Sequence, residues 1–300
     1  MESYPKSLDP RTLAKLQGLR LRARRIVEGF VAGLHRSPYR GFSVEFAEHR
    51  EYVPGDDIRH LDWKVFGRTD KFYLKQYEDE TNLICYLVLD VSESMSYRGP
   101  DSPFSKLEYA QCIAAALAWL VLQNQDAVGL ITFDRQIRDY VPPSNSPSRL
   151  NELLAVMEQA PSANKTSLGN TFQQLAQKLT KRGVVLVISD LFDEAKSVLN
   201  GLRHLRHRQH DLAVLQILDP AELSLPFDRP TLFRGLEGMP ELTTQPRAIR
   251  AAYQAELDSF LKQIKRGCLD NEIDYRLIST DRPFDVALSA FLSSRRTGSR

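Results

Sequence analysis

The fold of this chain is most clearly indicated by the segment Leu87-Val88-Leu89-Asp90-Val91-Ser92-Glu93-Ser94-Met95. An apolar run over residues 84–89 ends at Asp90, and hydroxyl side chains follow at every second position, Ser92 and Ser94. The run predicts a buried strand, and the three polar residues then lie on a roughly extended loop that leaves its carboxyl end. In open α/β sheets, that end of the strands is where ligands bind.

Beyond this stretch, apolar strands alternate with helices. We predict strands at residues 84–89, 127–133, 136–141, 184–189, 212–218 and 274–279, and helices at 106–123, 148–159, 168–181, 195–208, 247–265 and 285–295. Residues 219–240 are a proline-rich excursion with a short hairpin. Such alternation predicts an α/β fold of Rossmann type, with a mostly parallel central sheet flanked by helices.

Two regions precede this α/β domain. Asp9 and Pro10 form a good helix start, and a helical pattern continues to about residue 35. Residues 37–82 alternate charged with large aromatic side chains, with strand patterns at 41–46 and 71–77, and predict a small inserted β-rich module. We therefore divide the chain into an N-terminal helix (1–36), a β-rich module (37–82) and an α/β domain (83–300).

Composition narrows the functional class. The net charge of +2 is too small to indicate nucleic-acid or membrane binding by itself. The basic part of the first helix, which contains Arg20, Arg22, Arg24 and Arg25, is interpreted as a solvated face or as a face that docks a partner or phosphate. No secretory signal and no apolar stretch long enough to span a membrane is evident. The dispersed Cys85, Cys112 and Cys268 indicate reduced core residues, so we expect a cytoplasmic protein. From the apolar pattern and the small net charge, we expect neither a membrane span nor a nucleic-acid partner.

Three separate pieces of sequence predict one metal site. They are the group Asp90, Ser92 and Ser94, the polar-loop residue Thr166, and Asp190 at the end of the strand at 184–189. In a parallel sheet all carboxyl ends lie at one edge, so these pieces can meet there. Their carboxylate and hydroxyl oxygens suit Mg²⁺, with Mn²⁺ or Ca²⁺ as alternatives. Ser167 adjoins Thr166, which leaves open which hydroxyl reaches the metal.

The same residues resemble a known domain. Residues 84 to about 295 are similar to a von Willebrand factor A domain, whose metal-ion-dependent adhesion site matches Asp90, Ser92, Ser94, Thr166 and Asp190 one by one. A second resemblance is carried by Glu48-x-Arg50-Glu51-Tyr52-x-Pro54-Gly55-Asp56-Asp57-x-Arg59-x-x-Asp62-Trp63. It resembles the signature of the bacterial domain-of-unknown-function family 58. Some similar proteins have an N-terminal membrane anchor, and the lack of one here implies a soluble form.

The resemblance implies a function. Proteins of this kind are similar to those encoded beside MoxR-type AAA+ ATPases, so we expect a non-enzymatic adaptor that binds such an ATPase and a client protein in chaperone-like assembly or maturation. A bound Mg²⁺ keeps some water ligands, which leaves a position for a partner's carboxylate. The charged and aromatic residues of the module form either a salt-bridged scaffold or an interaction surface, for which the candidates are Arg50, Arg59, Asp62 and Trp63.

The alternative is an enzyme, a metal-dependent phosphotransferase or hydrolase with Asp90 as nucleophile. Phosphoaspartate enzymes of this topology usually carry a second aspartate two residues later, where this chain has Ser92. A glycine-rich loop that would cradle a phosphate is also missing from the sequence. We therefore expect adhesion rather than catalysis.

Overall fold

The computed structural model describes residues 8–36, 49–51, 67, 73–75, 83–159, 168–233, 241–285 and 288–289. The chain divides into two compact units. One consists of Met1–Gly33 with Leu83–Arg300, and the other of Leu34–Asn82. The first N-terminal helices therefore belong to the same unit as the α/β sheet.

The larger unit is built on a sheet of six strands in the order β10-β7-β6-β3-β4-β5. The strands are β3 (Ile84–Asp90), β4 (Ala127–Phe133), β5 (Ile137–Ser144), β6 (Val184–Ser189), β7 (Asp211–Leu218) and β10 (Asp274–Ser279). All neighbours pair in parallel except the edge strand β5, which is antiparallel to β4. This confirms the predicted α/β fold with a mostly parallel sheet.

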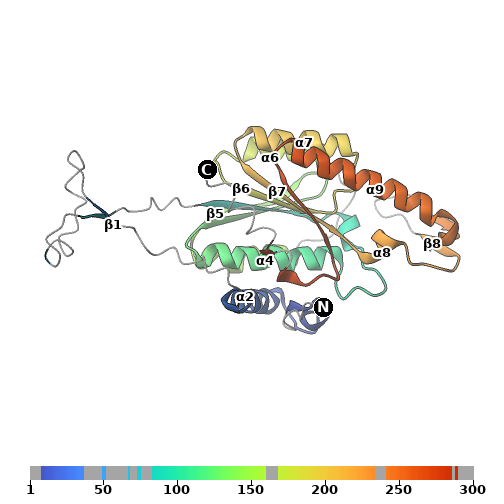
Figure 1. Ribbon diagram of the computed structural model, residues 1–300, viewed down its shortest axis with the longest axis horizontal. Helices are drawn as coiled ribbons and strands as arrows, with labels where there is room; N and C mark the ends of the chain where they lie inside the picture. Colours follow the sequence, from blue (N-terminus) through green and yellow to red (C-terminus); the bar gives the residue numbers. More distant parts are fainter. Residues whose placement is uncertain are drawn as a thin grey trace. The chain divides into compact units, whose positions relative to one another are not determined.

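Helices cover both faces of the sheet. Figure 1 shows α2 and α4 on one side and α6, α7 and α9 on the other. Their bounds are α2 (Leu19–Arg36), α4 (Lys106–Gln123), α5 (Arg149–Gln159), α6 (Leu168–Lys178), α7 (Ala195–His207) and α9 (Pro246–Asp270). Because both faces are covered, β3 is apolar at successive positions and nearly all of it is buried.

The N-terminal helix differs from the prediction. Asp9 caps a short helix α1 (Pro10–Leu13) by accepting a hydrogen bond of 2.9 Å from the backbone N–H of Arg11. The chain then turns before α2, and Gly18 has a φ of +81° there. A single helix over this region is wrong, because α1 ends at Leu13 and the chain turns directly before α2 at Gly18, where glycine adopts the left-handed conformation without steric cost.

The excursion after β7 has a short helix that the sequence analysis did not predict. Helix α8 (Pro220–Ser224) begins at the N-cap Asp219, and Glu222 completes a capping box. A hairpin is present as β8 (Thr231–Phe233) and β9 (Leu242–Thr244), and its second strand lies just beyond the predicted range of 219–240. The terminal helix predicted at 285–295 falls largely outside the described residues.

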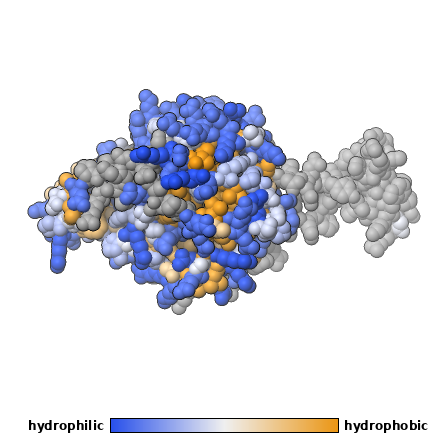
Figure 2. All heavy atoms as spheres, turned by 180° about the vertical axis from the view of Figure 1, so that it is seen from behind, coloured by the Kyte–Doolittle hydropathy of each residue, from blue (hydrophilic) through white to orange (hydrophobic). Residues whose placement is uncertain are grey.

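In the smaller unit, β1 (His49–Glu51) pairs antiparallel with β2 (Tyr73–Lys75). Strand β2 lies within the range predicted at 71–77, while the strand predicted at 41–46 is outside the described residues. On the face of the molecule in Figure 2, hydrophilic residues cover most of the coloured surface and apolar residues form separate patches. Of the helices described, none has the length and apolar character required to cross a membrane.

Candidate functional site

Two aspartates end neighbouring strands at the centre of the sheet. Asp90 is the last residue of β3, and Asp190 directly follows β6. The two strands pair in parallel, with Leu89 opposite Ile188. Both aspartates therefore lie at the same carboxyl edge, and both are buried.

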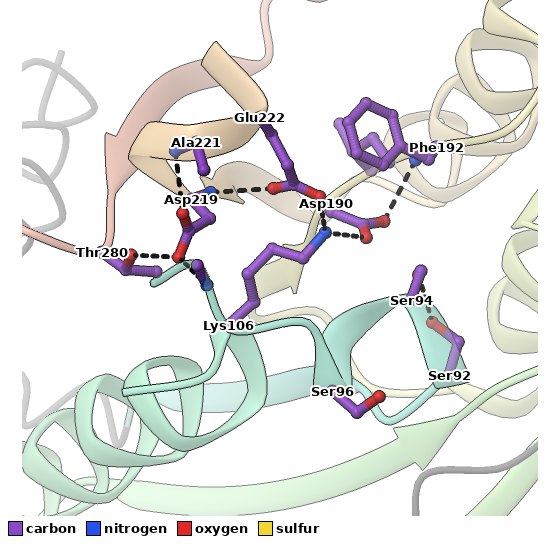
Figure 3. Close-up of polar contacts among 12 residues, drawn as sticks. Ser92, Ser94, Ser96, Lys106, Asp190, Phe192, Asp219, Ala221, Glu222 and Thr280 are labelled. Atoms are coloured by element: carbon purple, nitrogen blue, oxygen red, sulfur yellow. Dashed lines mark hydrogen bonds and ion pairs between the residues drawn. The ribbon is translucent and has the colours of Figure 1, made fainter. Parts of the chain in front are cut away.

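The loop after β3 brings its two hydroxyls together. Ser92 donates its backbone N–H to Oδ1 of Asp90 over 2.9 Å. The chain then enters a 3-10 helix, η3 (Glu93–Ser96), rather than the expected extended loop. The hydroxyl oxygens of Ser92 and Ser94 nevertheless lie 3.1 Å apart, and Figure 3 shows them facing each other.

Ser189 is part of this arrangement, although the sequence analysis did not single it out. Its hydroxyl donates a hydrogen bond of 2.6 Å to Oδ2 of Asp90. Burial and the nearby charge of Asp190 raise the pKa of Asp90 to about 7, against the opposing effect of the hydrogen bonds from Ser189 and Ser92. Asp90 is thus a buried carboxyl group that lacks sufficient positive charge around it.

A buried lysine lies at the same edge. The ammonium of Lys106 is 2.7 Å from Oδ2 of Asp190 and 2.6 Å from Oε1 of Glu222. Figure 3 draws both contacts. Burial alone would lower the pKa of Lys106, but the charges of Asp190 and Glu222 outweigh it and raise this pKa above its ordinary value. Burial raises the pKa of Glu222 as well.

Lys106 is a further site residue that was not predicted from the sequence. It is the first residue of the apolar helix α4, and Ser105 and Glu108 form a capping box around that helix start. A lysine at such a position ordinarily lies in solvent. The only sequence signal is therefore weak: one charge at the start of a helix that is otherwise apolar on most of its faces.

The backbone around Asp190 has its own support. The N–H of Phe192 donates to Oδ1 of Asp190 over 3.1 Å. The side-chain amide of Gln216 on β7 donates to the backbone carbonyl of Asp190 over 2.7 Å. The hydroxyl of Tyr275 on β10 in turn donates to Oε1 of Gln216 over 2.6 Å. This chain of contacts links the position of Asp190 to the edge of the sheet.

Several predicted site residues are outside the described part of the chain. Thr166 and Ser167 are among them, and so are Arg59, Asp62 and Trp63. Arg50 lies on β1, opposite Leu74. The structure thus brings together Asp90, Ser92, Ser94 and Asp190 at one edge, and the predicted third hydroxyl remains a prediction.

The side-chain oxygens at the carboxyl edge of β3 and β6 can be compared with the ligands that a metal ion requires. Within the described ranges, no group of three or more His, Cys, Asp and Glu side chains is placed to hold a metal. The candidate donors are instead carboxylates combined with serine hydroxyls, which are hard oxygen ligands. Asp190 and Glu222 share the ammonium of Lys106, while Asp90 is held by N–H and hydroxyl donors. The excess of negative charge and the raised pKa of Asp90 fit a divalent cation of the Mg²⁺ type.

The basic part of the first helix makes contacts within the chain. Arg22 donates to the backbone carbonyl of Leu16 over 2.9 Å, and its guanidinium lies 5.0 Å from the ring centre of Phe104. Arg24 and Arg25 both pair with Glu28. The exposed Arg24 and Arg25 agree with a solvated face, whereas Arg22 packs within the fold.

Comparisons with known proteins agree with this architecture. Residues 48–260 match the family described as "Protein of unknown function DUF58". Uncharacterized proteins from Mycobacterium tuberculosis and Mycobacterium bovis are 27% identical over 304 residues, which covers 97% of this chain and 92% of theirs.

One solved structure shows the same fold, and a second has a partial similarity. The conserved hypothetical protein BatB from Bacteroides thetaiotaomicron is 15% identical with a TM-score of 0.50, and the match covers 71% of this chain and 99% of that one. The von Willebrand factor A domain named SpRpn10 is 14% identical, with a TM-score of 0.40 over 70% of this chain and 94% of that one. The BatB structure therefore shares the fold of the described α/β unit.

Proposed function

Because the chain belongs to the family described as protein of unknown function DUF58, we propose that it is a non-enzymatic adaptor that binds other proteins through a metal-dependent site. The von Willebrand factor A-like fold supports a role in protein interaction. The site we assign to this role is the carboxyl edge of β3 and β6.

The observation that carries the proposal is the meeting of Asp90 and Asp190 at this edge, beside the paired hydroxyls of Ser92 and Ser94. Asp90, Ser92, Ser94 and Asp190 would hold Mg²⁺, and Thr166 or Ser167 would add a further hydroxyl. The bound ion would supply positive charge and an open position for an acidic side chain of the partner. The protein's own residues orient the ligands: Ser189 holds Asp90, and Phe192 holds Asp190.

We assign the partners from the sequence resemblance. They are a MoxR-type AAA+ ATPase and a client protein, which the adaptor would help to assemble or mature in the cytoplasm. The module that contains Arg50, Arg59, Asp62 and Trp63 would provide a second contact surface. Arginine and tryptophan are residue types that commonly carry binding energy at protein interfaces.

The test is affinity capture with the full chain in the presence of Mg²⁺ and after its chelation. We expect the ATPase and client to be captured with Mg²⁺, and to be lost with chelator or in Asp90→Ala. The control is Asp139→Ala, an aspartate on the edge strand β5 outside the site. Capture that neither chelation nor Asp90→Ala changes would refute the metal bridge.

A second candidate function is favoured by Lys106, a cation of the kind that phosphoaspartate enzymes use beside the nucleophile. Here its ammonium contacts Asp190 and Glu222. A phosphotransferase or hydrolase with Asp90 as nucleophile would turn over p-nitrophenyl phosphate or acetyl phosphate with Mg²⁺. Turnover that disappears in Asp90→Asn would support this enzyme. If wild type shows no more turnover than Asp90→Asn, the enzyme is refuted and the adaptor proposal stands.

A further inference from the structure

The ammonium of Lys106 is enclosed by three separate elements. Its side chain is 1% exposed and reaches from the start of α4 to Asp190 after β6 and to Glu222 on α8. It also lies 4.9 Å from the ring centre of Phe192 and 5.9 Å from that of Tyr97. A positive charge over an aromatic face is further stabilised there.

The backbone on either side of this ammonium is fixed as well. The N–H of Lys106 donates to the carbonyl of Tyr97 over 3.0 Å, directly after η3, which carries Ser94. Oε2 of Glu222 accepts from the N–H of Asp219 over 2.8 Å, so this carboxylate is held in the capping box of α8. Helix starts therefore fix the backbone of Lys106 and the carboxylate of Glu222, while burial and the two ion pairs hold the ammonium.

The charges at this edge do not cancel. Lys106 is the ammonium shared by Asp190 and Glu222, while Asp90 is held by N–H and hydroxyl donors. Opposite charges at such short range attract strongly away from bulk water. A divalent cation that binds Asp190 must therefore compete with the ammonium for this carboxylate and overcome the repulsion between the two positive charges.

We infer that Lys106 is a built-in counter-cation that weakens divalent-metal binding at this edge, and that Glu222 sets how strongly it does so. This inference rests on the metal site of the proposed function. Glu222 attracts the ammonium away from Asp190, and it thereby favours the metal. Since Glu222 belongs to α8, this short helix takes part in setting the metal affinity of a site formed by β3 and β6.

Substitutions of Lys106 and of Glu222 should change the affinity for Mg²⁺ in opposite directions. Lys106→Met keeps much of the side-chain volume and removes the competing charge, so Mg²⁺ should bind about tenfold more tightly or better. Glu222→Gln removes a negative charge and leaves Lys106 with Asp190 alone, so Mg²⁺ should bind several-fold more weakly. Arg138→Met is the matched control, because it removes an equal charge that pairs with Asp134 instead.

Stability provides a second readout. Without metal, Lys106→Met leaves buried carboxylates without their partner, which lowers the unfolding temperature. Added Mg²⁺ should restore it, because a ligand that binds only the folded state stabilises that state. The rise in unfolding temperature with Mg²⁺ should be largest for Lys106→Met and smallest for Glu222→Gln.

The experiment is calorimetric titration of the full-length protein and the three variants with MgCl₂, alongside thermal unfolding. The expected order of affinity is Lys106→Met, then wild type, then Glu222→Gln, with Arg138→Met within about twofold of wild type.

If Lys106→Met does not fold, a Glu222→Gln affinity equal to that of wild type still overturns the inference. If wild type binds Mg²⁺ and both Lys106→Met and Glu222→Gln bind it with the same affinity, the inference is overturned and the proposed function stands. Binding by Lys106→Met but not by wild type supports the inference and refutes the proposed function. An absence of Mg²⁺ binding in every protein overturns both.

Discussion

The hydroxyl of Ser189 donates a hydrogen bond of 2.6 Å to Oδ2 of Asp90 and so joins the carboxyl ends of β6 and β3. The same oxygen of Ser189 accepts the N–H of Leu191 over 2.9 Å, which orients its proton toward Asp90. With the N–H of Ser92 on Oδ1, both oxygens of Asp90 are held in place. Asp90 is therefore a preorganised carboxylate rather than a mobile one.

Ser189→Ala should raise the pKa of Asp90 above its value of about 7, because a hydrogen bond that favours the ionised form is lost. We expect a loss of roughly 1 kcal/mol in the free energy of unfolding and weaker Mg²⁺ binding at pH 7. Urea denaturation and Mg²⁺ titration at several pH values measure the two effects. Thr132→Ala is the control, because Thr132 also donates a 2.6 Å hydrogen bond to a carboxylate, that of Asp139 on β5. Equal Mg²⁺ affinities for both variants would contradict the assigned role of Ser189.

The raised pKa of Asp90 predicts a pH dependence of stability. Between the ordinary pKa of 3.8 and about 7, the folded state binds a proton that the unfolded state has released. The contribution of Asp90 to stability is therefore fully present below pH 3.8 and is lost as the pH rises through 7. In metal-free buffer, Asp90→Asn should remove this decline and should be more stable than wild type at pH 8 by roughly 1–3 kcal/mol.

Denaturation with urea from pH 5 to pH 8, in the presence of chelator, measures this effect. With added Mg²⁺ at pH 8, wild type should become more stable than Asp90→Asn, because only the ionised wild-type carboxylate is a good ligand for the ion. A wild-type protein whose stability falls no more steeply than that of Asp90→Asn would contradict the assignment of Asp90 as the titrating group.

The contact between Tyr275 and Gln216 should matter for Asp190. Tyr275→Phe removes the donor to Oε1 of Gln216 and leaves a buried acceptor without it, at a cost of roughly 1–2 kcal/mol. The loss of stability caused by Tyr275→Phe should be smaller in a Gln216→Met background, because the acceptor Oε1 is then absent. A double-mutant cycle by chemical denaturation measures the coupling. Tyr253→Phe, whose hydroxyl donates to the backbone of Glu222 instead, is a control that should show no coupling to Gln216.

Gly183 tests how closely the central strands approach. A Cβ at Gly183 would collide with the backbone carbonyl oxygen of Ile84, which belongs to the first residue of β3. Backbone atoms cannot move aside as a flexible side chain can, so Gly183→Ala should cost roughly 1–3 kcal/mol. Thermal unfolding measures it. An unfolding temperature equal to that of wild type would show that β3 and β6 separate more easily than their pairing indicates.

Much of the fold could be predicted because strand and helix periods are local. The apolar run that ends at Asp90 and the one that ends before Asp190 are both strands with nearly the predicted bounds. The parallel arrangement of these strands placed both aspartates at one edge, as expected. The N-terminal helix was predicted less well, because the helical pattern of the sequence continues through Gly18, although the backbone turns there.

Local patterns in the chain were enough to predict the succession of strands and the hard oxygen ligands that follow two of them. The tertiary structure alone decided that Lys106 joins them, since it is 84 positions from Asp190 and 116 from Glu222. Periodicity reports whether a position is buried, but it does not report which charges share the buried space. Only the packing of α4 and α8 against the sheet edge excludes water from this ammonium and makes it a partner of Asp190.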